Sequence, residues 1–491
     1  MNRSIRRLGV GLVVCYLALF VKLNWIQVLQ APELQANPLN TAEIRQDFNR
    51  SRGAITTADG ALLAQSIPNP DTTSEFERLR VYPEGVLFGQ VTGYFSFQYG
   101  ASGIERQYTN ELTGQTLTQQ VKGIGDLLVN AETVGNVTVS VRKDLQQIAQ
   151  AELGDREGSV VATDPRTGEV LAFWSFPSFD PNRLSGTDLE ATTEAWTLLN
   201  LAPGAPLQAH QYQERYFPGS TFKIVTAASG LQSGKVTNDE PVYPSASSYT
   251  PPQTNLPIRN FGGQTCGGSL PEVLRVSCNS AFAQMGQETI GAEDMIRGSE
   301  AFGFNRPVPI DLPAPARSNF PLDVVRDPPK LAQSSIGQSD VAATPLQMAM
   351  ATGAVANGGT IMSPYLMTQI RDSQGALVGE AKPTPWLTPL SPQNAETMRQ
   401  NLLAVVERGT ATGLQIPGFE VGGKTGTAQL GTDPPSSHTW IVGFAGPPGQ
   451  PATVAVSVVV LNQSGSSEAT GGRIAAPIAR AVLEAAVTRR R

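Results

Sequence analysis

The first hydrophobic feature of the chain is an apolar run near its start. Three arginines stand among the first seven residues, and apolar positions follow at 8–21 and, mixed with Lys22 and polar residues, up to position 29. Residues 8–29 are long enough to span about 30 Å of hydrocarbon if Lys22 reaches toward the interface. The basic residues predict a cytoplasmic N-terminus and an exported remainder. A cleaved signal peptide is the alternative, and it also leads to export.

Clear periodicity begins at residue 137. Alternating apolar positions at 137–141 predict a strand, and helical spacing at 143–153 predicts a helix with one apolar face. Residues 158–174 read as two strands joined by a turn at 164–168, where Asp, Pro and Gly gather. This part of the chain therefore mixes strands and helices.

The rest of the chain predicts a helical insert between two sets of strands. Helical segments are expected near 189–200, from residue 220 in a mainly helical region to about 302, and at 343–357 and 474–486, with a Pro-rich loop at 303–335. Three apolar runs separated by Gly and Pro turns predict strands at 419–430, 438–446 and 453–461. Because neighbouring hairpins bracket the insert, we expect one antiparallel sheet with helices packed on it, an α+β domain.

The 491 residues suggest two or three domains. Residues 30–50 are polar and indicate a membrane-proximal linker, and Asp59-Gly60 between short apolar pieces indicates a hairpin. The region before residue 140 has no nucleophile motif and no phosphate loop, so a structural or partner-binding module is the favoured interpretation. The expected division is a cytoplasmic tip and anchor over 1–29, an N-terminal module over 30–140 and a main domain over 141–491.

Composition narrows the possible chemistry. A net charge of −6 without a long basic run makes nucleic acid an unfavourable partner. His210 and His438 are the only histidines, which disfavours a Ser-His-Asp triad and a His-rich metal site. Cys266 and Cys278 lie in the exported part, where a disulfide can form and would contribute about 3 kcal/mol. Two free thiols are the alternative, since spacing alone does not supply the Cα separation that the bond needs.

The strongest candidate for chemistry is the stretch at 216–223, Tyr-Phe-Pro-Gly-Ser-Thr-Phe-Lys. Pro218 and Gly219 predict a sharp turn into a helix, so Ser220 stands at the helix N-terminus with Lys223 one turn away on the same face. Free backbone N–H groups there favour developing negative charge. A lysine that is desolvated, or beside another cation, loses its proton more easily and can serve as base for a neighbouring hydroxyl.

Ser-x-x-Lys alone is a weak signal, because it arises by chance in chains of this length. A second copy, Ser140 to Lys143, lies in the predicted strand and is interpreted as accidental. Support for Ser220 comes from a Ser-x-Asn tripeptide further on. The hydroxyl of Ser277 can relay a proton, and the amide of Asn279 can bind an acyl-amide carbonyl. A helix cap is the alternative for these two residues.

A Lys-Thr-Gly-Thr stretch lies within the strand expected at 419–430. Lys424 offers a positive charge, and the hydroxyls of Thr425 and Thr427 can bind a carboxylate. Gly426 removes a side chain, so a peptide can pair with the strand edge. The backbone N–H of Thr427, together with that of Ser220, can form an oxyanion hole. An ordinary glycine-containing edge strand is the alternative.

Together the three motifs, in this order, resemble the signature of penicillin-binding proteins and class A β-lactamases. Residues 52–60 and 103–108 are similar to the N-terminal pedestal of class B penicillin-binding proteins, and residues 164–172, 335–338 and 440–443 to their transpeptidase domain. The similarity covers most of residues 50–465. The length, single anchor, short pedestal and nearby Cys278 resemble the penicillin-binding protein A group of actinobacteria. One departure is that the stretch before Tyr216 lacks the Asn-Arg-Ala run usual there.

The resemblance implies a five-stranded antiparallel sheet flanked by helices, a mixed pedestal domain and one transmembrane helix. It also implies that Ser220 attacks the D-Ala-D-Ala amide of a peptidoglycan stem peptide with Lys223 as base. An amine of a neighbouring stem then splits the acyl-enzyme. Ser277 and Lys424 would pass the proton to the leaving D-Ala. The implied substrate-binding residues are Asn279, Thr425, Gly426 and Thr427.

The family implies partners as well. β-Lactams would acylate Ser220 and stay bound, and a membrane-embedded glycan polymerase and proteins of the division or elongation machinery are expected partners. No cofactor and no metal are expected. A D,D-carboxypeptidase or a β-lactamase, which use water in place of the amine, is an alternative, and so is a scaffold or regulator of a glycan polymerase. The intact Ser220, Lys223 and Lys424 argue against a pure scaffold.

Overall fold

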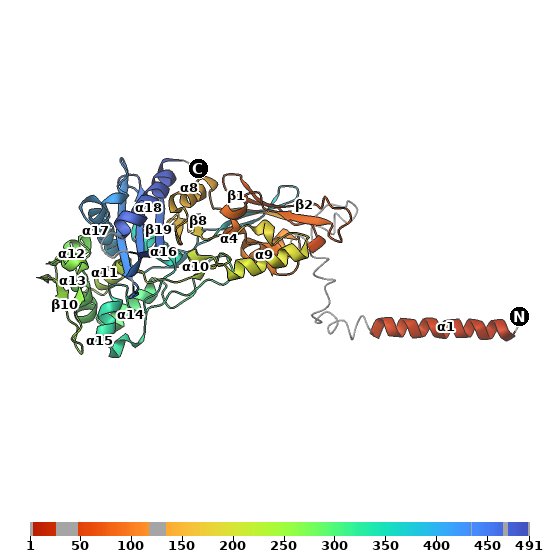
Figure 1. Cartoon of the computed structure of the whole chain (residues 1–491), viewed down its shortest axis with the longest axis horizontal. Helices are drawn as coiled ribbons and strands as arrows, with labels where there is room; N and C mark the ends of the chain where they lie inside the picture. Colours follow the sequence, from red (N-terminus) through yellow and green to blue (C-terminus); the bar gives the residue numbers. More distant parts are fainter. Residues whose placement is uncertain (1–2, 26–47, 117–133, 434, 465–469, 490–491) are drawn as a thin grey trace. The chain divides into compact units, whose positions relative to one another are not determined.

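The structure is a computed structural model that describes residues 3–25, 48–116, 134–433, 435–464 and 470–489 (Figure 1). It contains two compact units, one of Met1–Ser51 with Pro68–Leu79 and one of Arg52–Ile67 with Arg80–Arg491. The second unit carries all of the candidate site residues.

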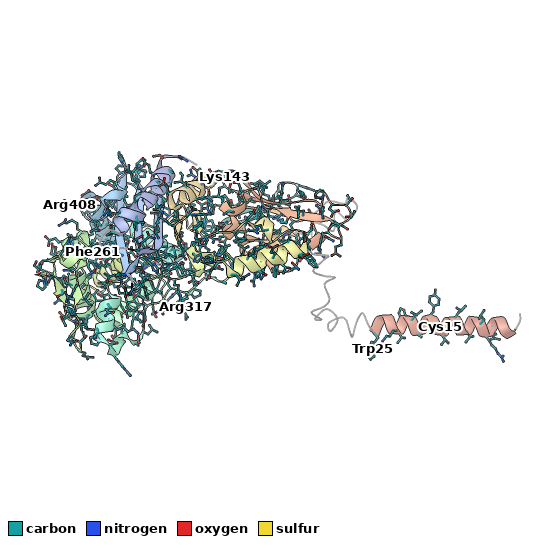
Figure 2. The ribbon with its side chains drawn as sticks, in the orientation of Figure 1. Cys15, Trp25, Lys143, Phe261, Arg317 and Arg408 are labelled. Carbon is teal, nitrogen blue, oxygen red and sulfur yellow. A yellow bond between two sulfur atoms is a disulfide. The ribbon has the colours of Figure 1, made fainter. Side chains whose placement is uncertain are left out.

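The first unit contains helix α1 (Arg3–Asn24), which bears the exposed free cysteine Cys15 labelled in Figure 2. None of the described helices is long and apolar enough to cross a membrane, whereas a transmembrane helix was expected over 8–29, a range that extends past α1. The physical reason is that the uncharged part of α1 covers only 8–21, between Arg7 and Lys22, whereas a span needs about 20 apolar residues. Residues 26–29 lie outside the described ranges.

One sheet forms the centre of the second unit. Its order is β17-β18-β19-β7-β8, and every neighbouring pair is antiparallel. All residues of β7 are buried, which indicates that both faces of this strand are covered. The strands are β7 (Gly158–Thr163), β8 (Val170–Phe176), β17 (Glu420–Gln429), β18 (Ser436–Gly446) and β19 (Val454–Ser464).

Two groups of helices cover this sheet. Helices α8 (Lys143–Leu153) and α18 (Gly471–Thr488) pack against each other and against strands of the sheet. Helix α16 (Pro345–Ala356) contacts β7, β18 and β19 and packs with α11 (Lys223–Gln232) and α17 (Pro392–Arg408). Every residue of α16 is buried, as expected for a helix with apolar residues on all sides. Its polar Gln347 and Thr352 bond to the carbonyl oxygens of Phe302 and Met348. The predicted α+β class is confirmed.

The region between α11 and α16 differs from the sequence prediction in two places. The stretch expected to be mainly helical to about 302 contains four short strands, and the loop expected at 303–335 contains the helices η7 and α15. Helix α15 begins with two prolines, which the first turn tolerates, and Asp327 caps it by accepting a bond from the Lys330 N–H. The elements are β9 (Tyr243–Ala246), β10 (Ser248–Tyr249), β11 (Ile258–Arg259), η5 (Phe261–Gly263), β12 (Cys266–Gly268), α12 (Leu270–Arg275), α13 (Asn279–Gln284), η6 (Met285–Ile290), α14 (Ala292–Ala301), η7 (Asp323–Arg326) and α15 (Pro328–Ser334).

A second sheet, of order β15-β14-β6-β1-β2-β3, is built largely from N-terminal strands. β1 pairs with β2 across the predicted Asp59-Gly60 turn, and β6 lies parallel to β1. β14 and β15, from much later in the chain, extend this sheet beside β6. The sequence did not predict these two strands. The strands are β1 (Ile55–Thr57), β2 (Leu62–Pro68), β3 (Arg78–Val81), β6 (Gly135–Val139), β14 (Met367–Asp372) and β15 (Leu377–Glu380).

The remaining elements are short, apart from α9. They are η2 (Gly85–Leu87), α4 (Gly89–Thr92), β4 (Phe95–Ser96), β5 (Gly100–Ala101), α5 (Gly103–Gln107), α6 (Thr109–Leu112), η3 (Pro181–Arg183), α9 (Leu189–Leu201), α10 (His210–Gln213), η4 (Gly219–Phe222), β13 (Ile361–Met362), β16 (Pro385–Leu387) and η8 (Thr412–Leu414).

The N-terminal motif residues form a buried ionic cluster. Arg52 Nη2 donates to Glu105 Oε2 over 2.8 Å, and Arg80 Nε donates to Glu105 Oε1 over 2.6 Å. Burial opposes ionisation of Glu105, but the two guanidinium groups outweigh it and lower the pKa of this carboxyl. The cluster joins the start of the second unit to β3 and α5.

Candidate active site

Ser220 opens onto a cleft of about 1080 Å³ in the second unit. It lies on η4, a single tight turn that leads directly into α11, so it stands just before the α-helix, close to where the sequence placed it. Gly219 has a φ of 52°. A Cβ at Gly219 would lie 2.7 Å from the carbonyl oxygen of Thr427, so glycine allows this turn to pack closely against β17.

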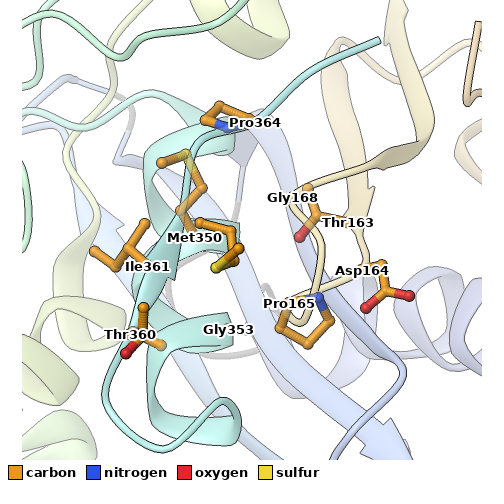
Figure 3. Close-up of a pocket in the computed structure, with 11 residues that line it drawn as sticks. Thr163, Asp164, Pro165, Gly168, Met350, Gly353, Thr360, Ile361 and Pro364 are labelled. Carbon is orange, nitrogen blue, oxygen red and sulfur yellow. The ribbon is translucent and has the colours of Figure 1, made fainter. Parts of the chain in front are cut away.

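A second, much smaller pocket lies between the turn at 164–168 and α16 (Figure 3). Its volume is about 10 Å³, room for about one water molecule. The carboxylate of Asp164 at its edge pairs with Arg166 over 2.6 Å. This pocket is therefore only a small packing gap beside the sheet. The cleft at Ser220 is the candidate site.

Lys223 is fully buried and points its ammonium group at the Ser-x-Asn tripeptide. Its Nζ donates to the carbonyl oxygen of Ser277 over 2.8 Å, to Ser277 Oγ over 3.3 Å and to Asn279 Oδ1 over 2.7 Å. Burial, and then repulsion from Lys424, lower the pKa of Lys223 well below its usual 10.5. The neutral amine that a base requires is therefore accessible.

Lys424 approaches Ser277 from the sheet. Its Nζ donates to Ser277 Oγ over 2.8 Å and to the carbonyl oxygen of Thr425 over 2.9 Å. Burial lowers the pKa of Lys424 to about 7. The Ser277 hydroxyl thus lies within hydrogen-bond distance of two buried lysines. Ser277 holds a φ of 61°, a strained conformation for a non-glycine residue.

A disulfide supports the loop that carries Ser277 and Asn279. Cys278, between them, is bonded to Cys266 on β12, with the two Cα atoms 5.9 Å apart. Asn279 Nδ2 donates to the carbonyl oxygen of Arg259 over 3.0 Å. The loop is therefore fastened to the far wall of the cleft as well as to the lysines.

The predicted strand motif lies along the same cleft, which Thr425, Gly426 and Thr427 all line. A Cβ at Gly426 would lie 2.9 Å from the carbonyl oxygen of Pro218, so the strand and the turn before Ser220 are in close contact. Trp440, the β18 partner of Gly426, donates its indole N–H to the carbonyl oxygen of Phe217 over 3.0 Å.

Sequence reasoning missed several residues of the cleft. Ile336 and Gln338 line the cleft, and Gly337 between them accepts the Gly219 N–H through its carbonyl oxygen over 2.9 Å; no role was predicted for these three residues. Thr410 lines the cleft and receives the Thr425 hydroxyl over 2.9 Å. Arg259 also lines it. No local pattern marks Thr410 or Arg259, because tertiary packing alone brings them to Ser220.

The histidines lie outside this arrangement. His210 bonds to the Tyr216 hydroxyl over 2.8 Å, and His438 is buried on β18, where burial lowers its pKa to about 4. In the described part of the chain, no three His, Cys, Asp or Glu side chains gather as a metal site would require. A serine in a cleft, backed by two buried lysines and a relaying hydroxyl, is suited to acyl transfer without histidine.

Comparison with known proteins places this geometry in a family. Residues 158–484 match the penicillin binding protein transpeptidase domain, and residues 52–138 match the penicillin binding protein A dimerisation domain. The chain therefore belongs to the penicillin-binding protein transpeptidase family.

Particular relatives are similar over the full length. The peptidoglycan D,D-transpeptidase PbpA of Mycolicibacterium smegmatis is 37% identical over 504 residues, with 99% of each chain covered, and that of Mycobacterium tuberculosis is 35% identical over 502 residues, also covering 99% of each. The ceftriaxone acyl-enzyme structure of M. tuberculosis penicillin-binding protein A superposes with a TM-score of 0.83 at 34% identity, covering 90% of this chain and 100% of that one. Its penicillin G acyl-enzyme complex has a TM-score of 0.80 at 35% identity, covering 89% and 99%.

Proposed function

We propose that this protein is a peptidoglycan D,D-transpeptidase that cross-links stem peptides through a Ser220 acyl-enzyme and is inhibited covalently by β-lactams. The observation that carries the proposal is the shared hydrogen bonding of Lys223 and Lys424 to Ser277, beside the cleft onto which Ser220 opens. The family, the PbpA relatives and the acyl-enzyme structures support it.

In the proposed acylation, Ser220 Oγ attacks the carbonyl carbon of the penultimate D-Ala, and its proton passes to neutral Lys223. The C–N bond to the terminal D-Ala breaks. The leaving nitrogen takes a proton through Ser277, which Lys424 replenishes. In the second half, the amine of a neighbouring stem attacks the ester carbonyl and passes a proton through Ser277 back to Lys424. The ester C–O bond breaks, and protonated Lys223 returns its proton to Ser220 Oγ.

The other predicted residues take binding roles in this proposal. Lys424 and the hydroxyls of Thr425 and Thr427 would bind the terminal carboxylate, and Asn279 would bind the acyl amide. Gly426 leaves the edge of β17 free of a side chain for pairing with the peptide backbone. The N–H groups of Ser220 and Thr427 would stabilise the oxyanion.

The finer localisation also belongs to the proposal. The Cys266–Cys278 disulfide supports a catalytic part outside the cytoplasm, where such bonds persist. Basic residues before the exposed apolar side chains of 8–21 support attachment through residues 1–29 with the N-terminus in the cytoplasm. Fractionation of cells that express the full chain or a variant lacking residues 1–29 tests this, and a deletion variant that still sediments with membranes would argue against it.

The N-terminal module over 30–140 is proposed as a pedestal that contacts a membrane-embedded glycan polymerase and division or elongation proteins. The match of residues 52–138 to a dimerisation domain supports an interaction role for this part. The transpeptidase domain would then occupy residues 141–491. Crosslinking in cells that produce the full chain, followed by identification of the captured membrane proteins, tests this arrangement, and capture of none would argue against it.

The reaction is tested with the full chain, a pentapeptide donor ending in D-Ala-D-Ala and an acceptor stem peptide. Mass spectrometry is expected to find a cross-linked dimer that has lost one D-Ala, and Ser220→Ala is expected to abolish it. A tetrapeptide without dimer would indicate the D,D-carboxypeptidase alternative. Neither product from the folded protein would favour the scaffold alternative and overturn the proposal.

A further inference from the structure

The cleft that holds Ser220 has an uneven distribution of charge. Of the described residues that line it, Arg259 is the one with a charged side chain, and the others carry hydroxyl, amide or apolar groups. Lys223 and Lys424 are fully buried behind it, with lowered pKa values. Arg259 is exposed, and within the ranges that the structure describes no acidic side chain pairs with it. An arginine keeps its charge at any physiological pH.

The backbone of Arg259 is held in place from several sides. It pairs with Ser248 in the β10–β11 ladder, and its carbonyl oxygen accepts the Asn279 amide over 3.0 Å. The next residue, Asn260, is buried, donates to the carbonyl oxygens of Ala246 and Gln264, and accepts the N–H of Ser280 at the start of α13. The cation is therefore carried by a fixed wall.

Arg259 lies beside the residue proposed to bind the acyl part of the donor. Asn279, which donates a hydrogen bond to the Arg259 carbonyl oxygen, is the residue proposed to bind the acyl amide. Lys424 and Thr425 are proposed to bind the terminal carboxylate. Two apolar residues close to Arg259 in the sequence also line the cleft: Ile258 and Phe261, the latter 46% exposed and labelled in Figure 2. A ligand group at this point would meet one cation beside an apolar surface.

We propose that Arg259 forms an anion subsite for a carboxylate carried by the acyl portion of the donor, separate from its terminal D-Ala carboxylate. The proposal rests on the proposed function. Stem peptides that bear a side-chain carboxylate near D-Ala-D-Ala, and β-lactams with a carboxylate on the side chain, have the required chemistry. Arg259 would thus be a specificity-determining residue, and it takes no part in proton transfer.

The test uses the full chain and two penicillins that share a phenylacetyl side chain and differ by a carboxylate on its α-carbon. The second-order acylation rate is measured for each by mass spectrometry, and their ratio is compared between variants. Arg259→Ala should lower the ratio about tenfold, the effect expected for loss of one partly exposed charge-assisted hydrogen bond. Arg259→Lys should retain part of the wild-type preference for the penicillin with the additional carboxylate. Arg306→Ala, an exposed arginine outside the cleft, is the matched control and should leave the ratio unchanged.

Two further readouts separate the possible outcomes. Raising the salt concentration should lower the ratio for the wild type and leave it unchanged for Arg259→Ala. If Arg259→Ala lowers the acylation rate equally for both penicillins, Arg259 only positions Asn279. If neither the rates nor their ratio change, Arg259 binds no anion. Either result overturns the subsite. A wild type that neither penicillin acylates would overturn the proposed function itself.

Discussion

Lys223 and Lys424 share one partner, the Ser277 hydroxyl, over 3.3 and 2.8 Å. Burial disfavours the charged form of both lysines, and Lys424 lowers the pKa of Lys223 further. A proton added to one lysine therefore raises the cost of a proton on the other. In the proposed mechanism this coupling returns the proton from Ser220 to the leaving group.

The pH dependence of acylation is the first prediction. The rate with a β-lactam should rise with pH through an apparent pKa well below 10.5, because only neutral Lys223 can accept the Ser220 proton. Loss of the Lys424 charge as the pH rises through about 7 should oppose this rise, because that charge binds the β-lactam carboxylate. Lys223→Arg should lower the acylation rate about 100-fold or more at every pH, because the arginine stays protonated. A single rise centred near 10.5 would contradict the proposed base.

The residues with motif chemistry could be predicted from the sequence, and their surroundings could not. Ser220, Ser277 and Lys424 belong to short patterns with legible roles. Thr410 and Arg259 come from an ordinary helix-to-turn junction and a two-residue strand, and they reach the cleft only through tertiary packing. The hydrogen bonds of Lys223 to Ser277 and Asn279 likewise depend on a left-handed backbone conformation at Ser277, which no sequence pattern predicts.

At the scale of elements, the site depends on how closely η4 packs against its neighbours. A Cβ at Gly219 would lie 2.7 Å from the carbonyl oxygen of Thr427, and one at Gly337 would lie 2.2 Å from the carbonyl oxygen of Gly219. Three backbone segments therefore meet without side chains between them. This contact places Ser220 against the end of β17 that carries Thr427.

Gly219→Ala tests this contact. The substitution strains a backbone with φ of 52° and forces η4 away from β17, so acylation should slow at least about tenfold, a loss of about 1.4 kcal/mol in transition-state stabilisation. Gly234→Ala is the control, since Gly234 has φ of 72° but no atom within 4 Å of its added Cβ. Stopped-flow acylation and thermal unfolding are measured together. Equal slowing by both substitutions would show that backbone strain alone, and not the contact, matters.

Long periodic elements were the easiest to predict. The helix predicted over 143–153 has those bounds in α8, because its apolar face packs on β8 as the pattern requires. The strands between 243 and 268 were missed, since they have two to four residues each and show no alternation. α15 was missed because its prolines suggested a loop, although they occupy the first turn.

At the scale of the second unit, distant segments are joined away from the cleft. β14, from the middle of the main domain sequence, pairs with β6 in the sheet of N-terminal strands. Tyr108 donates to Asp311 over 2.7 Å, and Asp311 accepts the N–H groups of Leu366 and Met367. Together with the Glu105 cluster, these contacts join the N-terminal strands to the main domain, with which they share one hydrophobic core.

Glu105→Gln should therefore destabilise the protein globally. It removes the carboxylate that pairs with Arg52 and Arg80 and leaves two buried guanidinium groups uncompensated, at a cost of about 3–5 kcal/mol in the free energy of unfolding. Denaturant unfolding measures this, with Glu293→Gln, an exposed carboxylate, as the control. The acylation rate per folded molecule should be unchanged. A loss below about 1 kcal/mol would contradict the proposed structural role.

The central claim is that Ser220 carries the acyl group, and labelling with a fluorescent penicillin followed by peptide mapping tests it most directly. The wild type is expected to hold the label covalently on the peptide that contains Ser220, and Ser220→Ala is expected to hold none while unfolding at the same temperature. Equal labelling of the Ser220→Ala variant, or label mapped to another peptide, would contradict the claim.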